Sequence, residues 1–237
     1  MRLKGFTGKN SMPEFPRFRF CGDTGLSVEL GDDIDIGINR KVHRLFHKLR
    51  LLNMSGIISM NPTYRSLFIC YDPWLCSYQR LMMTVSEICK DDSEDLQDET
   101  IIEIPVCYGD EFGPDLEELA AFHGMSADEV IQHHTMPDYQ VFLIGFTPGF
   151  PYLGGLDAKL YTPRKKTPRQ KVPAGSVGIA DRQSGIYPID SPGGWQIIGR
   201  TPIKIFDLGR DPIFLISAGN IVRFRAITKE QFENHPH

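Results

Sequence analysis

The stretch SVGIADRQSGIYPIDSPGGWQIIGR, residues 176–200, decides the fold class of this chain. Its short apolar runs, such as SVGIA and WQIIG, are separated by turns rich in proline and glycine, and none has a helical period. The pattern extends over residues 147–227 and includes the runs PIKIFDL (202–208), PIFLI (212–216) and NIVRFRAI (220–227). Many short strands separated by turn residues are typical of a β-sandwich or β-barrel.

Upstream of this region, residues 100–146 mix both kinds of element. Ser126 is followed three residues later by Glu129, the pair that forms a capping box at a helix start. The periodicity predicts, in order, a strand, two short helices and another strand: 100–109, 113–124, 126–134 and 139–146.

The N-terminal part predicts a separate, smaller unit. Apolar residues at helical spacing follow residue 34, and a second amphipathic segment covers 74–90, with about four strands around them. Six acids crowd residues 91–99, which is typical of a solvated linker, although an acidic docking tail is the alternative. The predicted fold class is α+β: a small α/β domain over 15–92, then a β-rich domain over 100–230.

Composition excludes several classes of protein. A net charge of −4 argues against a nucleic-acid coat, and no run approaches the roughly 18 apolar residues of a membrane span. The N-terminus lacks the apolar core of a secretory signal. The five cysteines are odd in number and widely spread, without a C-x-x-C, as in reduced thiols of a cytoplasmic protein. We therefore expect a cytoplasmic chain that binds neither nucleic acid nor membrane.

Two stretches carry candidate binding chemistry. GFTPGFPYLGGL, residues 145–156, concentrates glycine, proline and aromatic residues. Such a loop could expose backbone N–H groups to a ligand, or its rings could simply plug one end of a barrel. In PRKKTPRQK, residues 163–171, Arg164 and Arg169 each follow a proline, so either could hold a carboxylate or phosphate. A solvated charged face is the alternative.

Two further patterns are weaker. Ser176 lies in AGSVG, one residue short of the nucleophile elbow, but an apolar β-like run follows it where the elbow needs a helix. His43 and His47 have the spacing of a metal pair on a helix, but no third ligand accompanies them, so we expect surface histidines. His134 ends a predicted helix just before the β region and could serve as acid, base or ligand contact, or have no role.

The order and spacing of three motifs resemble one known family. IPVCYGDEFGPDLEELA, GFTPGFPYLGGL and the segment from PR at 163–164 to TP at 201–202 closely resemble the family of 5-oxoprolinase B subunits. That family includes Kip-type inhibitors of sporulation histidine kinases and is also called the allophanate-hydrolase-subunit-1 or carboxyltransferase C/D-subdomain family. The resemblance implies a cyclophilin-like β-barrel for the second domain, after a small α/β domain.

The resemblance also implies a function and site residues. It implies the B component of an ATP-dependent 5-oxoprolinase that cleaves 5-oxoproline to glutamate, with a companion carboxyltransferase-type C component and a lactam-opening A component as its partner subunits. ATP would act in the complex, and this chain itself would bind no metal or biotin. The alternative is an inhibitor that binds a sensor histidine kinase and blocks its autophosphorylation. The implied catalytic residues are His134, Arg164 and Arg169; the implied substrate-binding residues are Phe146, Gly149, Phe150, Tyr152, Ser176, Gln183, Tyr187, Ser191, Gly193, Gly194, Trp195, Arg200 and Thr201.

Overall fold

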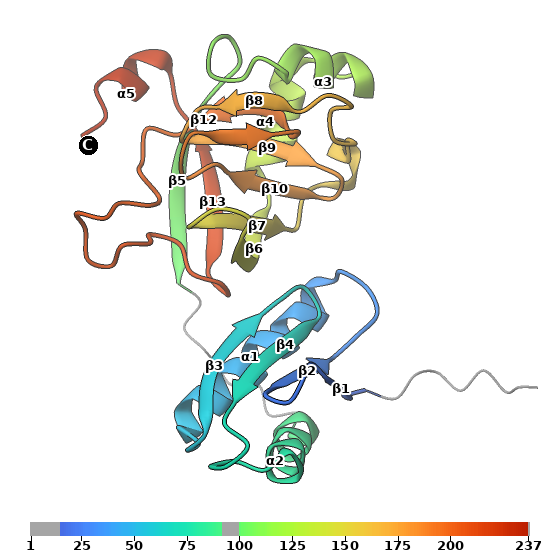
Figure 1. The fold of residues 1–237 in the computed structure, drawn as a ribbon. Coiled ribbons are helices and arrows are strands. Elements are labelled where there is room, and N and C mark those ends of the chain that lie inside the picture. The colour runs from blue at the N-terminus through green and yellow to red at the C-terminus, as the bar shows by residue number, and fades with distance from the viewer. Residues whose placement is uncertain (1–14, 92–99, 237) are drawn as a thin grey trace, which may run out of the picture.

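The computed structural model describes residues 15–91 and 100–236. Figure 1 shows two bodies, a small sheet with two helices and a larger barrel. The predicted linker, 91–99, lies outside the described residues except for Asp91, whose carboxylate pairs with Lys48 Nζ at 2.7 Å. Among the described residues, no helix combines the length and the apolar character that a membrane span requires. The five cysteines are free.

The smaller body is a four-stranded antiparallel sheet with two helices. Its strands have the order β1-β2-β4-β3, and apolar residues of β2 and β4 form one core with those of both helices. The Asp35 and Ser77 side chains cap the two helices at their N-termini, as their residue types favour. The elements are β1 (Arg17–Phe20), β2 (Gly25–Glu29), α1 (Ile36–Leu52), β3 (Ile57–Pro62), β4 (Ser66–Tyr71) and α2 (Tyr78–Lys90).

The larger body is a closed seven-stranded barrel. The strand order is β10-β7-β6-β13-β5-β12-β9, and β13 and β5 are the one parallel pair among these neighbours. A separate two-stranded ribbon pairs β8 with β11. The strands are β5 (Ile101–Tyr108), β6 (Asp138–Gly145), β7 (Phe150–Gly154), β8 (Arg169–Val172), β9 (Ser176–Ala180), β10 (Gln183–Ile186), β11 (Ser191–Gly193), β12 (Gln196–Arg200) and β13 (Ile221–Ala226).

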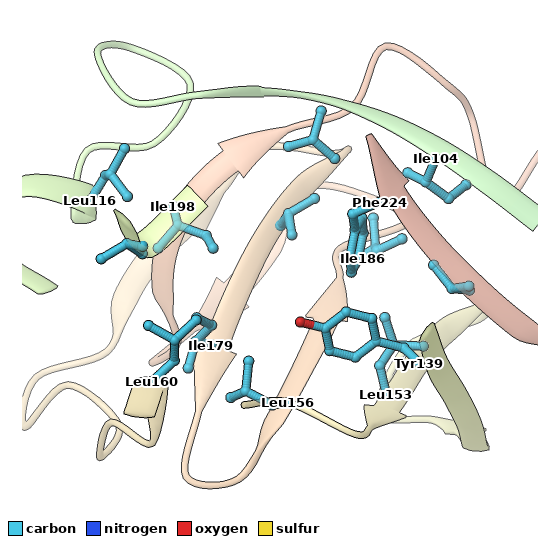
Figure 2. Close-up of a cluster of buried hydrophobic side chains, with 14 of the residues drawn as sticks. Ile104, Leu116, Tyr139, Leu153, Leu156, Leu160, Ile179, Ile186, Ile198 and Phe224 are labelled. Atoms are coloured by element: carbon cyan, nitrogen blue, oxygen red, sulfur yellow. The ribbon is translucent and has the colours of Figure 1, made fainter. Parts of the chain in front are cut away.

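The barrel encloses an apolar core. Branched residues from the strands fill it together with Tyr139 and Phe224, as Figure 2 shows. Helices α3 (Leu116–His123) and α4 (Ala127–Thr135) contribute Leu116 and Val130 to the same core. The predicted capping box of α4 is present, because Ser126 and Glu129 each accept from the other's backbone N–H. The short helices η1 (Ala158–Leu160) and α5 (Lys229–Glu233) complete the body.

The predicted α+β fold class, an α/β domain followed by a β-barrel domain, is confirmed, but two predicted strands are not. Residues 202–208 and 212–216 form an irregular loop that contains a single bridge between Phe206 and Phe214. The physical reason is Arg210, whose guanidinium donates to the carbonyls of Lys204 at 2.9 Å and Pro212 at 3.1 Å. A side chain thus satisfies backbone acceptors that a neighbouring strand would otherwise need to satisfy.

The two bodies meet through buried polar contacts between α1 and β6. Asn39 is fully buried, and its amide nitrogen donates to the Phe142 carbonyl at 3.2 Å, while Gln140 Nε2 donates to Asn39 Oδ1 at 2.8 Å. His43 Nε2 donates to the same carbonyl at 3.1 Å. The prediction of a surface His43 is therefore wrong: the ring is 5% exposed, and burial lowers its pKa. Helical spacing placed His43 on α1 but gave no sign that the barrel covers it.

Candidate functional site

Aromatic residues of the first and third motifs meet in one cluster on the barrel. Phe150 at the start of β7 is in edge contact with Tyr187 and Trp195, with ring centroids 5.1 and 5.4 Å apart. Tyr152 lies beside Phe150 at 4.9 Å and reaches Trp195 at 6.0 Å. Phe150, Tyr187 and Trp195 are buried, whereas Tyr152 is half-buried. The cluster therefore fills space in the way that the plug alternative describes, and presents Tyr152 at its edge.

Two glycines of the motifs have a structural reason. A Cβ at Gly193 would lie 2.2 Å from the Tyr187 hydroxyl oxygen, so only glycine lets β11 pass that close to the ring. Gly149 has φ +84°, a left-handed conformation that favours glycine in the turn before β7. That turn leaves Phe146 outside: its side chain is 62% exposed and touches Phe150 edge-on at 5.6 Å. Phe146 is thus the residue of this loop that is free to contact another molecule.

A polar rim adjoins the cluster, and one of its members comes from the smaller body. Tyr64, between β3 and β4, donates its hydroxyl hydrogen to Gln183 Oε1 at 3.2 Å and meets Tyr152 edge-on at 5.9 Å. Gln183 is 9% exposed, and its Nε2 is buried without a partner among the described residues. Sequence reasoning missed Tyr64, because nothing in NPTYRS signals contact with a residue 119 positions away.

Arg164 supplies the charge of this rim. Its guanidinium is well exposed and lies 3.4 Å from the exposed carboxylate of Asp181. Burial raises the pKa of Tyr64 and of Tyr187 to about 12, and the Arg164 charge opposes that rise at both, as it does at Tyr152. One cation therefore faces three phenol groups, an arrangement that suits a small anion.

Arg169 is engaged elsewhere, by Asp115. Its Nη2 donates to Asp115 Oδ1 at 2.6 Å, and Lys165 Nζ donates to the same oxygen at 2.7 Å. The backbone N–H of Ile197 donates to Asp115 Oδ2 at 2.7 Å. Burial raises the pKa of Asp115, but these donors outweigh it and the pKa is lowered. The Asp115 carboxylate, whose side chain is 3% exposed, thus joins the start of α3 to the arginine segment and to β12.

The sequence predicted Asp115 only as a residue near a helix start. It is the N-cap of α3, yet its side chain makes no capping hydrogen bond and reaches other elements instead. Of the five positive charges in 163–171, two are held by Asp115, and Lys171 pairs with Asp190 at 2.8 Å. Arg164 and Lys166 remain exposed to solvent. The segment is therefore partly structural, and its anion-binding capacity rests on Arg164 and Lys166.

The remaining predicted binding residues divide between the ribbon and β12. Ser191 on β11 is buried and its Oγ has no partner among the described residues, while the Gly194 carbonyl accepts from the Lys165 backbone N–H at 2.7 Å. Thr201 is buried, and its hydroxyl accepts from the Ile203 backbone N–H at 3.2 Å. Arg200 instead stacks over Phe112 and Phe232, at 5.2 and 5.8 Å from the ring centroids. Its described contacts do not join it to the rim.

Ser176 and His134 are placed for structural roles. Ser176 is 2% exposed and begins strand β9, not a helix, so it does not form a nucleophile elbow. His134 is fully buried, with Nδ1 2.8 Å from the Tyr108 hydroxyl and Nε2 2.8 Å from Ser184 Oγ. Burial lowers its pKa to about 3, so the ring is neutral at neutral pH. Its catalytic role stays a prediction, and this enclosure argues against it.

No group of three or more His, Cys, Asp or Glu side chains that could hold a metal ion occurs within 15–91 and 100–236. Two surface hollows lie away from the rim, one lined by residues of α1, α2 and Phe15, the other beside α5. The rim formed by Tyr64, Tyr152, Arg164 and Gln183 is therefore the candidate site that the sequence motifs and the structure share. We call these four residues the junction rim, since they come from both bodies.

Comparisons with known proteins identify the family. The model of the carboxyltransferase domain, subdomain C and D, matches residues 16–216. The chain is 40% identical to the 5-oxoprolinase B subunit of Bacillus subtilis over 222 residues, which cover 89% of this chain and 92% of that one. It is 39% identical to the 5-oxoprolinase B subunit of Escherichia coli O157:H7, covering 88% and 94%.

A solved structure agrees with this assignment. The crystal structure of TTHA0988 matches with a TM-score of 0.77 and 35% identity, over 86% of this chain and 40% of that one. This chain thus spans less than half of the TTHA0988 chain. By its family model and by its curated relatives, the chain belongs to the family of 5-oxoprolinase B subunits, which are carboxyltransferase subdomain C and D proteins.

Proposed function

We propose that this chain is the B component of an ATP-dependent 5-oxoprolinase that converts 5-oxoproline to glutamate in the cytoplasm. The observation that carries the proposal is the near full-length similarity, at 39–40% identity, to two proteins of that name. A match over about nine-tenths of both chains includes both bodies and the junction between them, not the barrel alone. A protein named as one subunit of an enzyme implies others, which we take to be a second barrel-type protein and a lactam-opening protein.

The chemistry of the junction rim is compatible with this substrate. 5-Oxoproline carries one carboxylate and one lactam, so it needs one cationic partner and neutral hydrogen-bonding partners. Arg164 is exposed and only loosely paired, and phenol groups surround it. ATP hydrolysis in the complex would supply the free energy for ring opening, by phosphorylation of the amide oxygen. Positive charge near that oxygen or near the carboxylate stabilises the charge that develops there.

Reconstitution tests the proposal. This chain, the second barrel-type protein and the lactam-opening protein are mixed with 5-oxoproline and ATP, and glutamate and phosphate are followed together. We expect coupled release of both products, lost when this chain is omitted. A complete, well-folded mixture that yields no glutamate, or the same glutamate without this chain, would refute the proposal.

Substitution of Arg164 makes the test residue-specific. Arg164→Gln removes an exposed charge, so we expect turnover to fall by at least about tenfold with the unfolding midpoint unchanged. Lys171→Gln is the matched control, because Lys171 is an exposed cation of the same segment that pairs with Asp190. Arg169 is a poor choice for this purpose, because its removal would also leave the buried Asp115 underpaired.

The kinase-inhibitor alternative stays a prediction of the sequence resemblance. It is distinguished by the same reagents: if the reconstituted mixture is inactive, the chain is tested for binding to a sporulation-type sensor histidine kinase and for loss of its autophosphorylation. Binding with inhibition would then replace the enzyme proposal.

A further inference from the structure

Tyr64 brings the N-terminal body into contact with the barrel motifs. It lies in the turn between β3 and β4, and that turn is fixed by buried Asn39, whose amide donates to the Tyr64 carbonyl at 3.2 Å. Its ring meets Tyr152 and Phe142 of the barrel edge-on, at centroid distances of 5.9 and 6.0 Å. Tyr64 is half-buried, so one side of the ring packs and the other reaches solvent.

Gln183 fixes the orientation of the Tyr64 hydroxyl. The hydroxyl hydrogen points to Gln183 Oε1, at 3.2 Å, and so it cannot point to a ligand at the same time. The phenol oxygen keeps its lone pairs and is left as an acceptor. Gln183 itself is held by burial, at 9% exposed, so it acts on a ligand only through Tyr64.

Tyr152 offers the complementary group. Its hydroxyl has no hydrogen bond to any residue in the part of the chain that the structure describes, and the side chain is half-buried. Such a hydroxyl is free to donate. Arg164 adds a guanidinium that is paired only loosely, with Asp181 at 3.4 Å. The rim therefore presents one acceptor, one donor and one cation, close enough that the Tyr152 and Arg164 groups both act on Tyr64 electrostatically.

A small cyclic amide that carries a carboxylate matches these three groups. Its N–H needs an acceptor, its carbonyl oxygen needs a donor, and its carboxylate needs a cation. Aromatic ring faces beside the polar atoms suit the apolar carbons of a five-membered ring. Neither the donor nor the cation distinguishes this ligand from a simple anion, but the acceptor on Tyr64 does.

We propose that the junction rim is the lactam-acid site of this protein: the Tyr64 oxygen accepts from the lactam N–H, Tyr152 donates to the lactam carbonyl, and Arg164 pairs with the carboxylate. Gln183 is a positioning residue that acts through Tyr64. The inference rests on the proposed function for the identity of the ligand, and it makes the N-terminal body part of the substrate site. The barrel without its first body would therefore lack a contact to the amide.

The first test measures binding by titration calorimetry of the full chain with three probes. 5-Oxoproline has all three groups, 2-pyrrolidinone lacks the carboxylate and cyclopentanecarboxylate lacks the amide. We expect 5-oxoproline to bind at least about tenfold more tightly than either analogue. Equal affinity for cyclopentanecarboxylate, or no binding of 5-oxoproline at millimolar concentration, would overturn the proposal.

Substitutions assign the contacts. Tyr64→Phe should weaken 5-oxoproline and 2-pyrrolidinone about five- to tenfold and leave cyclopentanecarboxylate unchanged. Arg164→Gln should weaken the two carboxylates and leave 2-pyrrolidinone unchanged. Gln183→Met should reproduce the Tyr64→Phe pattern, and the double variant should lose no more than either single one. A merely structural role would affect all three probes alike, and that result would overturn the assignment.

Tyr78→Phe is the matched control. Tyr78 begins α2 in the same body, and its ring packs on Phe20 at 4.2 Å, so losing its hydroxyl should alter none of the three affinities. Kinetics of the reconstituted complex separate this inference from the proposed function. Coupled turnover with an unchanged KM in Tyr64→Phe would refute the site and leave the function standing. Probe selectivity as expected, in a mixture that does not need this chain for turnover, would do the reverse.

Discussion

Asp115→Ala should be among the most damaging substitutions in the barrel. The carboxylate is 3% exposed and accepts hydrogen bonds from Arg169, Lys165 and the Ile197 backbone N–H. Removing one partner of a buried ion pair leaves the others without compensation and costs about 3–5 kcal/mol. We expect the free energy of unfolding of the barrel to fall by that amount.

Glu118→Ala is the matched control, because Glu118 also accepts from Lys165, at 3.1 Å, with a side chain 76% exposed. An exposed ion pair contributes up to about 1 kcal/mol, so the two variants differ in burial more than in chemistry. Urea unfolding followed by the fluorescence of the buried Trp195 measures both. The other tryptophan, Trp74, is 93% exposed and should report little of this transition. Equal losses in the two variants would refute the reasoning.

The same carboxylate should also leave a mark in the pH dependence. The pKa of Asp115 is lower in the folded chain than in the unfolded one, despite burial, because of its three donors. Its stabilisation is therefore complete above the unfolded value of about 3.9 and is lost as pH falls toward the folded value. The stability gap between the native chain and Asp115→Ala should narrow below about pH 4. A gap that stays constant there would contradict the assigned charge.

Three further substitutions test other parts of the structure. Gly193→Ala should cost about 1–3 kcal/mol, because its Cβ would collide with the buried Tyr187 hydroxyl, whereas Gly194→Ala, whose Cβ would meet nothing closer than 3.7 Å, should be tolerated; equal effects in urea titrations would disprove the collision. His134 has its pKa lowered to about 3 by burial, so the unfolded chain takes up a proton below about pH 6.5 while the folded chain stays neutral. The native chain should lose about 1.4 kcal/mol per pH unit from this group between those values, and His134→Phe should lack that part of the slope; identical slopes would show that the ring is not held neutral. Asn39→Ala should make the amides of β6 exchange hydrogen faster, because it removes the donor to the Phe142 carbonyl; unchanged protection would mean that the junction does not depend on it.

Most of the fold could be predicted from the sequence because its elements are locally consistent. The α4 capping box lies in residues three positions apart, and the α1 periodicity in one short window. The error at 202–216 is of another kind. The apolar runs there satisfy a strand pattern, but Arg210 and the adjacent turns occupy their backbone acceptors. A side chain that substitutes for a strand leaves no periodic signal.

The candidate site was harder to predict, since its contacts are long-range. The motifs identified the neighbourhood, including Tyr152, Arg164 and Gln183. They did not separate Arg164, which remains exposed, from Arg169, which a buried acid 54 residues away in the chain engages. Tyr64 carries no local signal because the turn that holds it does not depend on its hydroxyl. Such pairs become visible only when the fold brings the two bodies together.

The parallel pairing of β13 with β5 has a consequence for how the protein is made. The strand that closes the barrel is the last of the barrel strands to leave the ribosome, and it inserts between β6 and β5. Glu103 and Arg225, 122 residues apart, form an ion pair across that seam. Until residue 226 is available, β5 and β6 each present an unpaired edge to other nascent chains. During synthesis the barrel is therefore an open sheet, and premature termination anywhere before β13 should yield a fragment that depends on chaperones or aggregates.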